Sequence, residues 1–112
     1  MKGESFGGIR NELRRGSLIL AVAGALRTER YGYTLRKALQ DKGIEIDEGT
    51  LYPLLRRMET QGLLLSEWRE QDKRKRRFYH LTQVGEQTLQ ELQSEWLSFN
   101  KNIEGILNES TH

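Results

Sequence analysis

The sequence predicts a mainly α (α+β) fold, and three patterns in it lead to that prediction. Three short segments in the N-terminal half space their apolar residues at helical intervals. Two β-prone runs then flank a stretch that is dense in Lys and Arg. Near the C-terminus, apolar residues recur every three or four positions, which is typical of a long helix packed along one partner helix. A chain of 112 residues is long enough for one domain with a modest core.

Two helices are predicted in the first part of the chain. Residues 9–26 carry apolar side chains at helical spacing, although two glycines weaken the pattern. Residues 31–39 form a second, short helix, and Lys42-Gly43 ends it as a basic last turn followed by a C-cap glycine. Both helices would bury one face against the rest of the domain.

A third helix is predicted after Gly49, with one apolar and one polar face. Asp47 or Thr50 can cap its N-terminus, and Gln61-Gly62 ends it. At about 100° per residue, the apolar face holds Leu51, Leu54, Leu55 and Met58. The opposite face holds Pro53, Arg56 and Thr60, with Tyr52 and Arg57 on its flanks. An ordinary solvated face would explain this pattern too, but the guanidinium groups can also contact phosphate or guanine.

A hairpin with basic residues is predicted after Gly62. The β-prone runs at 63–69 and 76–82 would form its strands. No Asn-Gly or Asp-Gly marks a tight turn, so we expect a long loop that is mobile until bound. Six Lys or Arg residues lie within the nine residues 69–77, a density that favours a polyanionic partner over a merely solubilising turn. Alternation along the second strand predicts that Arg77 points inward as an ion-pair partner.

A long last helix is predicted from Thr82 to about Leu107. Its apolar seam consists of Leu89, Leu92, Trp96, Phe99, Ile103 and Ile106. A helix of about 25 residues is nearly 40 Å long, which exceeds what a core of this size requires. We therefore expect self-association through the seam, with packing on the chain's own core as the alternative.

Three helices followed by a basic hairpin describe a winged helix-turn-helix over residues 9–82. The third helix would enter the major groove, and the hairpin tip would lie against phosphate or in the minor groove of double-stranded DNA. Residues 83–108 would form the dimerisation helix, with a contribution from helix 9–26, and residues 1–8 and 109–112 are expected to be flexible ends. A dimer of this kind would place two third helices one turn apart on a palindromic site.

Composition excludes several kinds of site. The chain has no Cys, and its histidines are His80 and His112, so we expect no metal site and no cofactor. Its apolar runs are all shorter than the roughly 18 residues of a membrane span, and the N-terminus lacks a signal-peptide pattern. We therefore expect a cytoplasmic protein that does not contact membranes.

Other function classes explain the chain less well. An enzyme would need a nucleophile, a phosphate-binding loop or a His–carboxylate arrangement, and none of these is recognisable. The carboxylate pair Asp47-Glu48 suits a helix start instead. A protein-interaction or architectural module without an effector stays open as an alternative, as does recruitment of another protein by the acidic last helix. The dense cations of the hairpin favour DNA over either.

Four segments resemble the PadR family of bacterial transcriptional regulators. These segments are GSLILAVAGAL (16–26), YGYTLRKAL (31–39), GTLYPLLRRMETQGLL (49–64) and RRFYHLTQVG (76–85). They occur in the family's order and spacing, and the resemblance covers roughly residues 10–108. It implies a winged helix-turn-helix with a C-terminal dimerisation helix. It also implies a homodimeric repressor of its own or a neighbouring promoter, which small aromatic effectors release from DNA.

The resemblance is to a compact branch of the family, in which a tryptophan of the dimerisation helix stacks on ligand between the subunits. Trp96 lies at the corresponding position, and Ile9, Leu13 and Phe99 would line the same space. The alternative is that Trp96 and Phe99 are ordinary packing residues of the seam, with no effector.

Candidate DNA contacts follow from the third helix and the hairpin. Arg56 is the best candidate for reading a base edge, since Arg on guanine is the commonest specific contact. Arg57 would contact phosphate, and the hairpin cations would add affinity without sequence preference. The full predicted set is Tyr33, Thr50, Tyr52, Pro53, Arg56, Arg57, Lys73, Arg74, Lys75 and Arg76.

Overall fold

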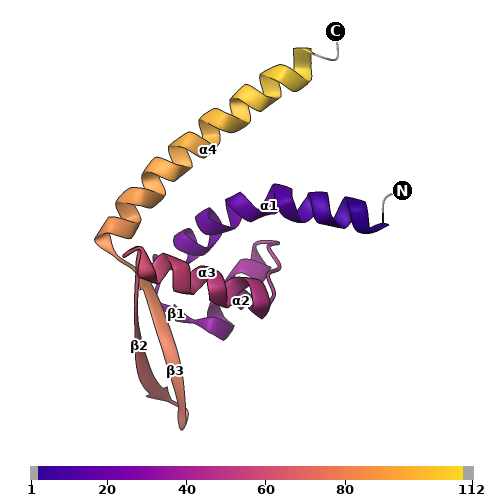
Figure 1. Ribbon diagram of the computed structural model, residues 1–112. Helices are drawn as coiled ribbons and strands as arrows, with labels where there is room; N and C mark the ends of the chain where they lie inside the picture. Colours follow the sequence, from indigo (N-terminus) through magenta and orange to yellow (C-terminus); the bar gives the residue numbers. More distant parts are fainter. Residues whose placement is uncertain (1–2, 110–112) are drawn as a thin grey trace.

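The computed structural model describes residues 3–109, and this part of the chain folds into four helices and three strands (Figure 1). In chain order these are α1 (Gly3–Ala25), β1 (Arg30–Tyr31), α2 (Gly32–Asp41), α3 (Glu48–Thr60), β2 (Leu64–Gln71), β3 (Arg74–Leu81) and α4 (Gln83–Glu109). The predicted α+β fold is confirmed: α2 and α3 form the helix-turn-helix, and β2 and β3 form the wing.

The first helix is longer than the sequence predicts. It begins at Gly3 instead of Ile9, so residues 3–8, expected as part of a flexible end, are helical. Once a helix is nucleated, each added residue contributes one hydrogen bond, and glycines lower this tendency without ending the helix. Residue 109 is also helical, whereas residues 1–2 and 110–112, the rest of the expected flexible ends, lie outside the described residues.

The core lies where α1, α2 and α3 meet the base of the wing. The apolar side of α3 is fully confirmed, because Leu51, Leu54, Leu55 and Met58 are all buried. The other buried apolar side chains are Val22, Ala23, Leu26, Leu35, Leu39, Ile46, Leu63, Leu64, Tyr79 and Leu89. This core fixes α3 by one face and leaves the opposite face exposed.

The wing ends in a tight turn, so the prediction of a long loop is wrong. Strands β2 and β3 pair up to Gln71 and Arg74, which leaves only Asp72 and Lys73 between them. Both turn residues have positive φ, 54° and 64°, as the two-residue turn with the twist of a hairpin requires. Glycine usually takes such positions, so the residue types Asp72 and Lys73 did not indicate this turn.

A third strand joins the sheet in the order β1-β3-β2. Strand β1 has only two residues, Arg30 and Tyr31, and pairs antiparallel with Tyr79 and Phe78 of β3. The prediction included Tyr31 in the second helix, but α2 begins one residue later. The short strand anchors the entry to α2 against the wing.

The last helix begins at Gln83, one residue after the predicted start, and Thr82 caps it. The Thr82 hydroxyl accepts a hydrogen bond from the Gly85 N–H at 2.9 Å and donates to the Gly62 carbonyl at 2.7 Å. A Cβ at Gly85 would collide with the Leu63 carbonyl, so this glycine permits the close approach of α4 to the end of α3.

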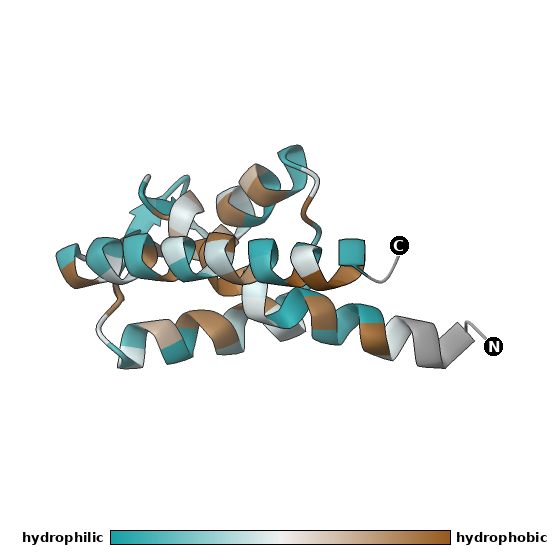
Figure 2. Ribbon diagram, turned by 90° about the horizontal axis from the view of Figure 1, so that it is seen from above, coloured by the Kyte–Doolittle hydropathy of each residue, from teal (hydrophilic) through white to brown (hydrophobic). Residues whose placement is uncertain are grey.

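Helices α1 and α4 run antiparallel and diverge toward their outer ends (Figure 1). Figure 2 shows apolar positions along both helices well beyond the core. In the part of the chain that the structure describes, no helix is both long and apolar enough to cross a membrane.

Candidate nucleic-acid interface

The outward face of α3 presents the predicted recognition residues to solvent. Thr50, Tyr52, Pro53, Arg56 and Arg57 are all exposed. The helix begins after Asp47, whose carbonyl accepts hydrogen bonds from the N–H groups of residues 50 and 51. Of the two caps left open by the sequence, Asp47 occupies the N-cap position, although its side chain makes no capping hydrogen bond to the backbone. A hydrogen bond with the Thr50 side chain is the main cause that lowers the pKa of the Asp47 carboxyl.

This start places Pro53 inside α3 and not in its first turn. A proline there removes the N–H that would bond to the Gly49 carbonyl. Both residues lie on the exposed side of the helix, where water can satisfy that carbonyl.

Two arginines of α3 are available for an anionic partner. Among residues 3–109, no carboxylate lies within ion-pair distance of Arg56 or Arg57. Most other arginines of the domain hold a carboxylate, a carbonyl or an aromatic ring. Arg56 and Arg57 both lie on the face of α3 that the fold turns outward.

A cleft opens between the start of α2, the start of α3 and the inner face of the wing. Its lining is aromatic and basic, and consists of Tyr31, Gly32, Tyr33, Arg36, Glu48, Tyr52, Trp68, Lys75, Arg76, Arg77 and Tyr79. Four of the predicted DNA contacts, Tyr33, Tyr52, Lys75 and Arg76, thus line one cleft. Gly32 leaves room for the Tyr52 ring in this cleft, because a Cβ at residue 32 would collide with the Tyr52 hydroxyl.

The register of the wing divides its cations between two faces. Lys75 and Arg77 share one face with Trp68, whereas Arg74 and Arg76 lie on the other. Lys73 sits in the turn itself. Lys75, Arg76 and Arg77 line the cleft, whereas Arg69, Lys73 and Arg74 are not among its lining residues.

Three of the six cations at 69–77 serve the wing itself. Arg77 confirms the prediction of an inward ion pair: Nε donates to Ser66 Oγ at 2.9 Å, and Nη2 lies 3.4 Å from Glu59 Oε1. Arg76 lies over the Tyr31 ring, with its guanidinium carbon 4.5 Å from the ring centroid. The third is Arg69, which has two carboxylate partners and one aromatic contact.

Arg69 pairs with Glu29 and with Glu67, and its guanidinium lies 4.2 Å from the centroid of the Phe78 ring. The hydrogen bond with Glu29 raises the pKa of Arg69. Among the described residues Lys73, Arg74 and Lys75 have no such partner, so the cations left for a polyanion gather at the tip of the wing.

Sequence reasoning missed two residues of the cleft. Trp68 is 60% exposed on β2, beside Arg77, and no pattern in the sequence distinguished it from a packed strand residue. The strand register places Trp68 directly opposite Arg77, so both side chains lie on the same face of the wing. Arg36 of α2 was the other; its Nη1 lies 3.2 Å from Glu48 Oε1 at the start of α3.

A second group of predicted residues lies between α1 and α4. Trp96 and Phe99 line one cleft with Ile19, Leu20 and Leu92. Trp96 also lines a neighbouring cleft, together with Leu13. Three of the four predicted ligand contacts are therefore brought near one another, but Ile9 lines neither cleft and is 68% exposed.

The seam of α4 needs one correction. Leu89 is only 5% exposed and packs in the chain's own core, because it lies near the base of α4, where α1 and the wing meet it. Beyond it, Trp96, Phe99, Ile103 and Ile106 are between 37% and 68% exposed. The surface that a second copy could cover thus begins near Leu92.

Comparisons with known proteins agree on one family. The model of the "Transcriptional regulator PadR-like family" matches residues 19–91. The transcriptional regulator Rv3488 of Mycobacterium tuberculosis (strain ATCC 25618 / H37Rv) is 43% identical over 81 residues, which cover 71% of this chain and 76% of that protein.

Solved structures give the same result. A PadR family transcriptional regulator from Eggerthella lenta DSM 2243 is similar at a TM-score of 0.86 and 40% identity, covering 93% of both chains. A PadR-like transcription factor from Bacteroides fragilis is similar at a TM-score of 0.73 and 32% identity, covering 88% of this chain and 98% of that chain.

Proposed function

The chain belongs to the PadR-like family of transcriptional regulators, which are not enzymes, and from this premise we propose that it is a homodimeric, DNA-binding repressor. In this proposal α3 enters the major groove of a palindromic operator, and the wing lies along the adjacent backbone. A small aromatic effector then releases the protein from DNA.

The observation that supports DNA binding best is the distribution of free cations. Arg56 and Arg57 of α3 and Lys73, Arg74 and Lys75 of the wing have no ion-pair partner among residues 3–109. An exposed Arg on a recognition helix can bond to guanine O6 and N7, while tip cations suit phosphates. Tyr33, Thr50, Tyr52, Pro53 and Arg76 would complete the contact surface, and we add Trp68 as an apolar contact from the wing.

The dimer is supported by the apolar seam of α4. Trp96, Phe99, Ile103 and Ile106 lie on one side of α4 and outside the core cluster of the described residues. Such a row is typical of helix pairing, in which apolar positions three and four apart interdigitate. We infer that a second copy covers this row.

The proposed release mechanism depends on the same helix. An aromatic ligand that stacks on Trp96, beside Leu13 and Phe99, would change the angle between the two α4 helices of the dimer. The two α3 helices would then no longer match successive major grooves, about 34 Å apart. Equal spacing of the α3 helices in ligand-bound and ligand-free crystals would contradict this mechanism.

The decisive experiment is fluorescence anisotropy on DNA from upstream of the protein's own gene, with a scrambled duplex as control, at about 150 mM salt. A preference of roughly 10³-fold or more would support a sequence-specific regulator, and the same assay would then screen aromatic compounds. Equal, strongly salt-dependent binding to both duplexes would point to an architectural role. Absence of binding to either would favour a protein-docking module.

A further inference from the structure

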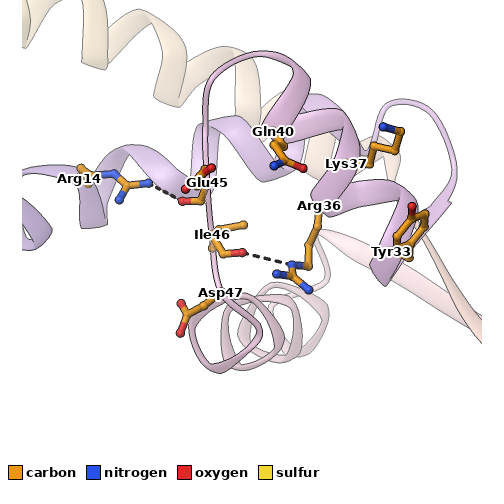
Figure 3. Close-up of a pocket in the computed structure, with 8 residues that line it drawn as sticks. All are labelled: Arg14, Tyr33, Arg36, Lys37, Gln40, Glu45, Ile46 and Asp47. Carbon is orange, nitrogen blue, oxygen red and sulfur yellow. Dashed lines mark hydrogen bonds between the residues drawn. The ribbon is translucent and has the colours of Figure 1, made fainter.

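The turn that joins α2 to α3 is held by two arginines from different helices. Arg14 of α1 donates from Nη2 to the Glu45 carbonyl at 2.7 Å, and Arg36 of α2 donates from Nε to the Ile46 carbonyl at 3.2 Å. Figure 3 shows the two guanidinium groups approaching the turn from opposite sides. The two carbonyls are consecutive, and they directly precede Asp47, the N-cap of α3.

The two hydrogen bonds differ in the sequence separation of donor and acceptor. Arg36 belongs to the helix-turn-helix itself, ten residues before its acceptor, and also pairs with Glu48 of α3. Arg14 lies 31 residues before its acceptor, on a helix outside the helix-turn-helix. Among the side chains that the structure describes, no other residue of α1 donates a hydrogen bond to this turn. Arg14 is thus the polar link between α1 and the start of α3.

Arg14 also stands on the boundary between two clefts. One cleft, drawn in Figure 3, is lined by Arg14 with Tyr33, Arg36 and Asp47 on the side of the helix-turn-helix. The other is lined by Arg14 with Leu13 and Trp96 on the side of α4. If α1 moves relative to α4, Arg14 moves with it, and the hydrogen bond from Arg14 can transmit this movement to the turn.

From this geometry we propose that Arg14 is a positioning residue for the recognition helix. A hydrogen bond from a charged donor is stronger and shorter than a neutral one, and here it fixes the backbone two residues before the N-cap of α3. The bond holds the orientation of α3 relative to α1, so that the two α3 helices of a dimer keep a constant separation. This role rests on the proposed DNA-binding function and adds to it a route by which α1 and α4 act on α3.

The chain provides a matched control in Arg10. Arg10 lies on α1 one turn before Arg14, lines the same cleft with Trp96, and makes no hydrogen bond to the turn. Arg10→Gln and Arg14→Gln remove the same charge from the same helix. Differences between the two variants therefore report the hydrogen bond to Glu45 and not the overall charge.

The experiment combines hydrogen–deuterium exchange with DNA affinity. In Arg14→Gln, amides of residues 44–51 should exchange faster than in Arg10→Gln. Affinity for the operator should fall roughly fivefold or more, the size expected for the loss of about one hydrogen bond, with little change on a scrambled duplex. Arg14→Lys, which keeps a charged donor, should restore most of both properties.

Two results would overturn the proposal. Equal exchange of residues 44–51 in Arg14→Gln and Arg10→Gln would mean that Arg14 does not order the turn. An equal loss on both duplexes, with the slope of log affinity against log salt reduced by about 0.9, would identify Arg14 as a phosphate contact instead. If the wild-type protein bound no DNA, the exchange comparison would still test the positioning role, while the proposed function would fail.

Discussion

Two halves of the molecule, one formed by α3 and the wing and the other by α1 and α4, differ in the kind of side chain that they expose. In the first half, the apolar side of α3 is buried in the core and the exposed face carries arginines. In the second half, large apolar side chains of α1 and α4, such as Leu13 and Phe99, stay exposed. The exposed face of the first half therefore suits an anionic partner, whereas that of the second suits an apolar one.

Because the two halves expose different kinds of side chain, the two proposed activities, DNA binding and self-association, can be tested by separate substitutions. Substitutions on α3 and the wing should alter DNA binding and leave self-association intact. Substitutions on the outer part of α4 should alter self-association first and DNA binding only as a consequence. Each prediction below tests one side of this division.

The largest effect is expected from a charge in the α4 seam. Ile103→Asp should produce a monomer, because Ile103 lies beyond the chain's own core and a carboxylate cannot be buried there without a partner. Affinity for a palindromic operator should fall by roughly 10²- to 10⁴-fold, since the two half-sites are then bound independently. Sedimentation and anisotropy would measure the two effects.

Ser94→Asp is the matched control, since it adds the same charge to an exposed position on the opposite side of α4. It should leave the dimer intact. A dimeric Ile103→Asp variant with normal operator affinity would mean that the seam does not mediate self-association.

The next effect concerns base recognition by α3. Arg56→Ala should cost about 1–3 kcal/mol of operator binding and relax the sequence preference at one base pair. Arg57→Ala, which removes the neighbouring exposed guanidinium, should weaken operator and random DNA alike. Anisotropy on both duplexes separates the two outcomes, and equal losses for Arg56→Ala would contradict base reading.

A smaller, sequence-independent effect is expected at the wing. Lys75→Ala should weaken binding to every duplex by a similar factor and reduce the salt slope by about 0.9, as loss of one phosphate contact does. Lys42→Ala, at the far end of α2, removes the same charge outside the proposed interface. A salt slope that responds equally to both substitutions would show only a general charge effect.

The two tryptophans report on the two halves separately. The chain has only two, and Trp68 lies on the wing while Trp96 lies on α4. Operator DNA should change the fluorescence of Trp96→Phe, which retains Trp68, because the exposed indole lies in the proposed interface. The emission of Trp68→Phe should change on dilution to monomer. If operator DNA changed only the fluorescence of Trp68→Phe, which retains Trp96, the DNA-binding surface would lie near α4 and not on the wing.

The residues that were predicted correctly are those whose position depends on local sequence. The buried side of α3 followed from helical spacing, and the predicted start of α4 at Thr82 was within one residue of the observed start at Gln83. Inward placement of Arg77 followed from alternation along one strand. Each inference needed only a few neighbouring residues.

The features that were missed depend on contacts between distant segments or on rare backbone conformations. The tight wing turn has non-glycine residues at positive φ, which cross-strand pairing along both strands can support. Which cations are free depends on the register of β2 and β3, and the Arg14–Glu45 bond depends on how α1 packs on the turn. Even the core role of Leu89 is invisible from its place in the seam.

The smallest effect is expected from the ion pair that joins α4 to the end of α1. Arg27, just after α1, donates from Nε and Nη2 to the Glu86 carboxylate of α4, both at 2.8 Å. The bond with Arg27, helped by Gln90, lowers the pKa of Glu86 below its ordinary value of 4.5. The group therefore adds stability at pH values above about 4.5, and that stability is lost as the pH falls through the lower, folded-state pKa.

Glu86→Gln should be slightly less stable than the wild type near neutral pH, and this difference should shrink in acid. Glu91→Gln, an exposed carboxylate of α4 with no ion pair among residues 3–109, should show no such convergence. Denaturant unfolding at several pH values would measure both variants. A difference between Glu86→Gln and the wild type that does not change with pH would mean that the ion pair does not fasten α4 to the end of α1, and that these two helices are held together by apolar packing alone.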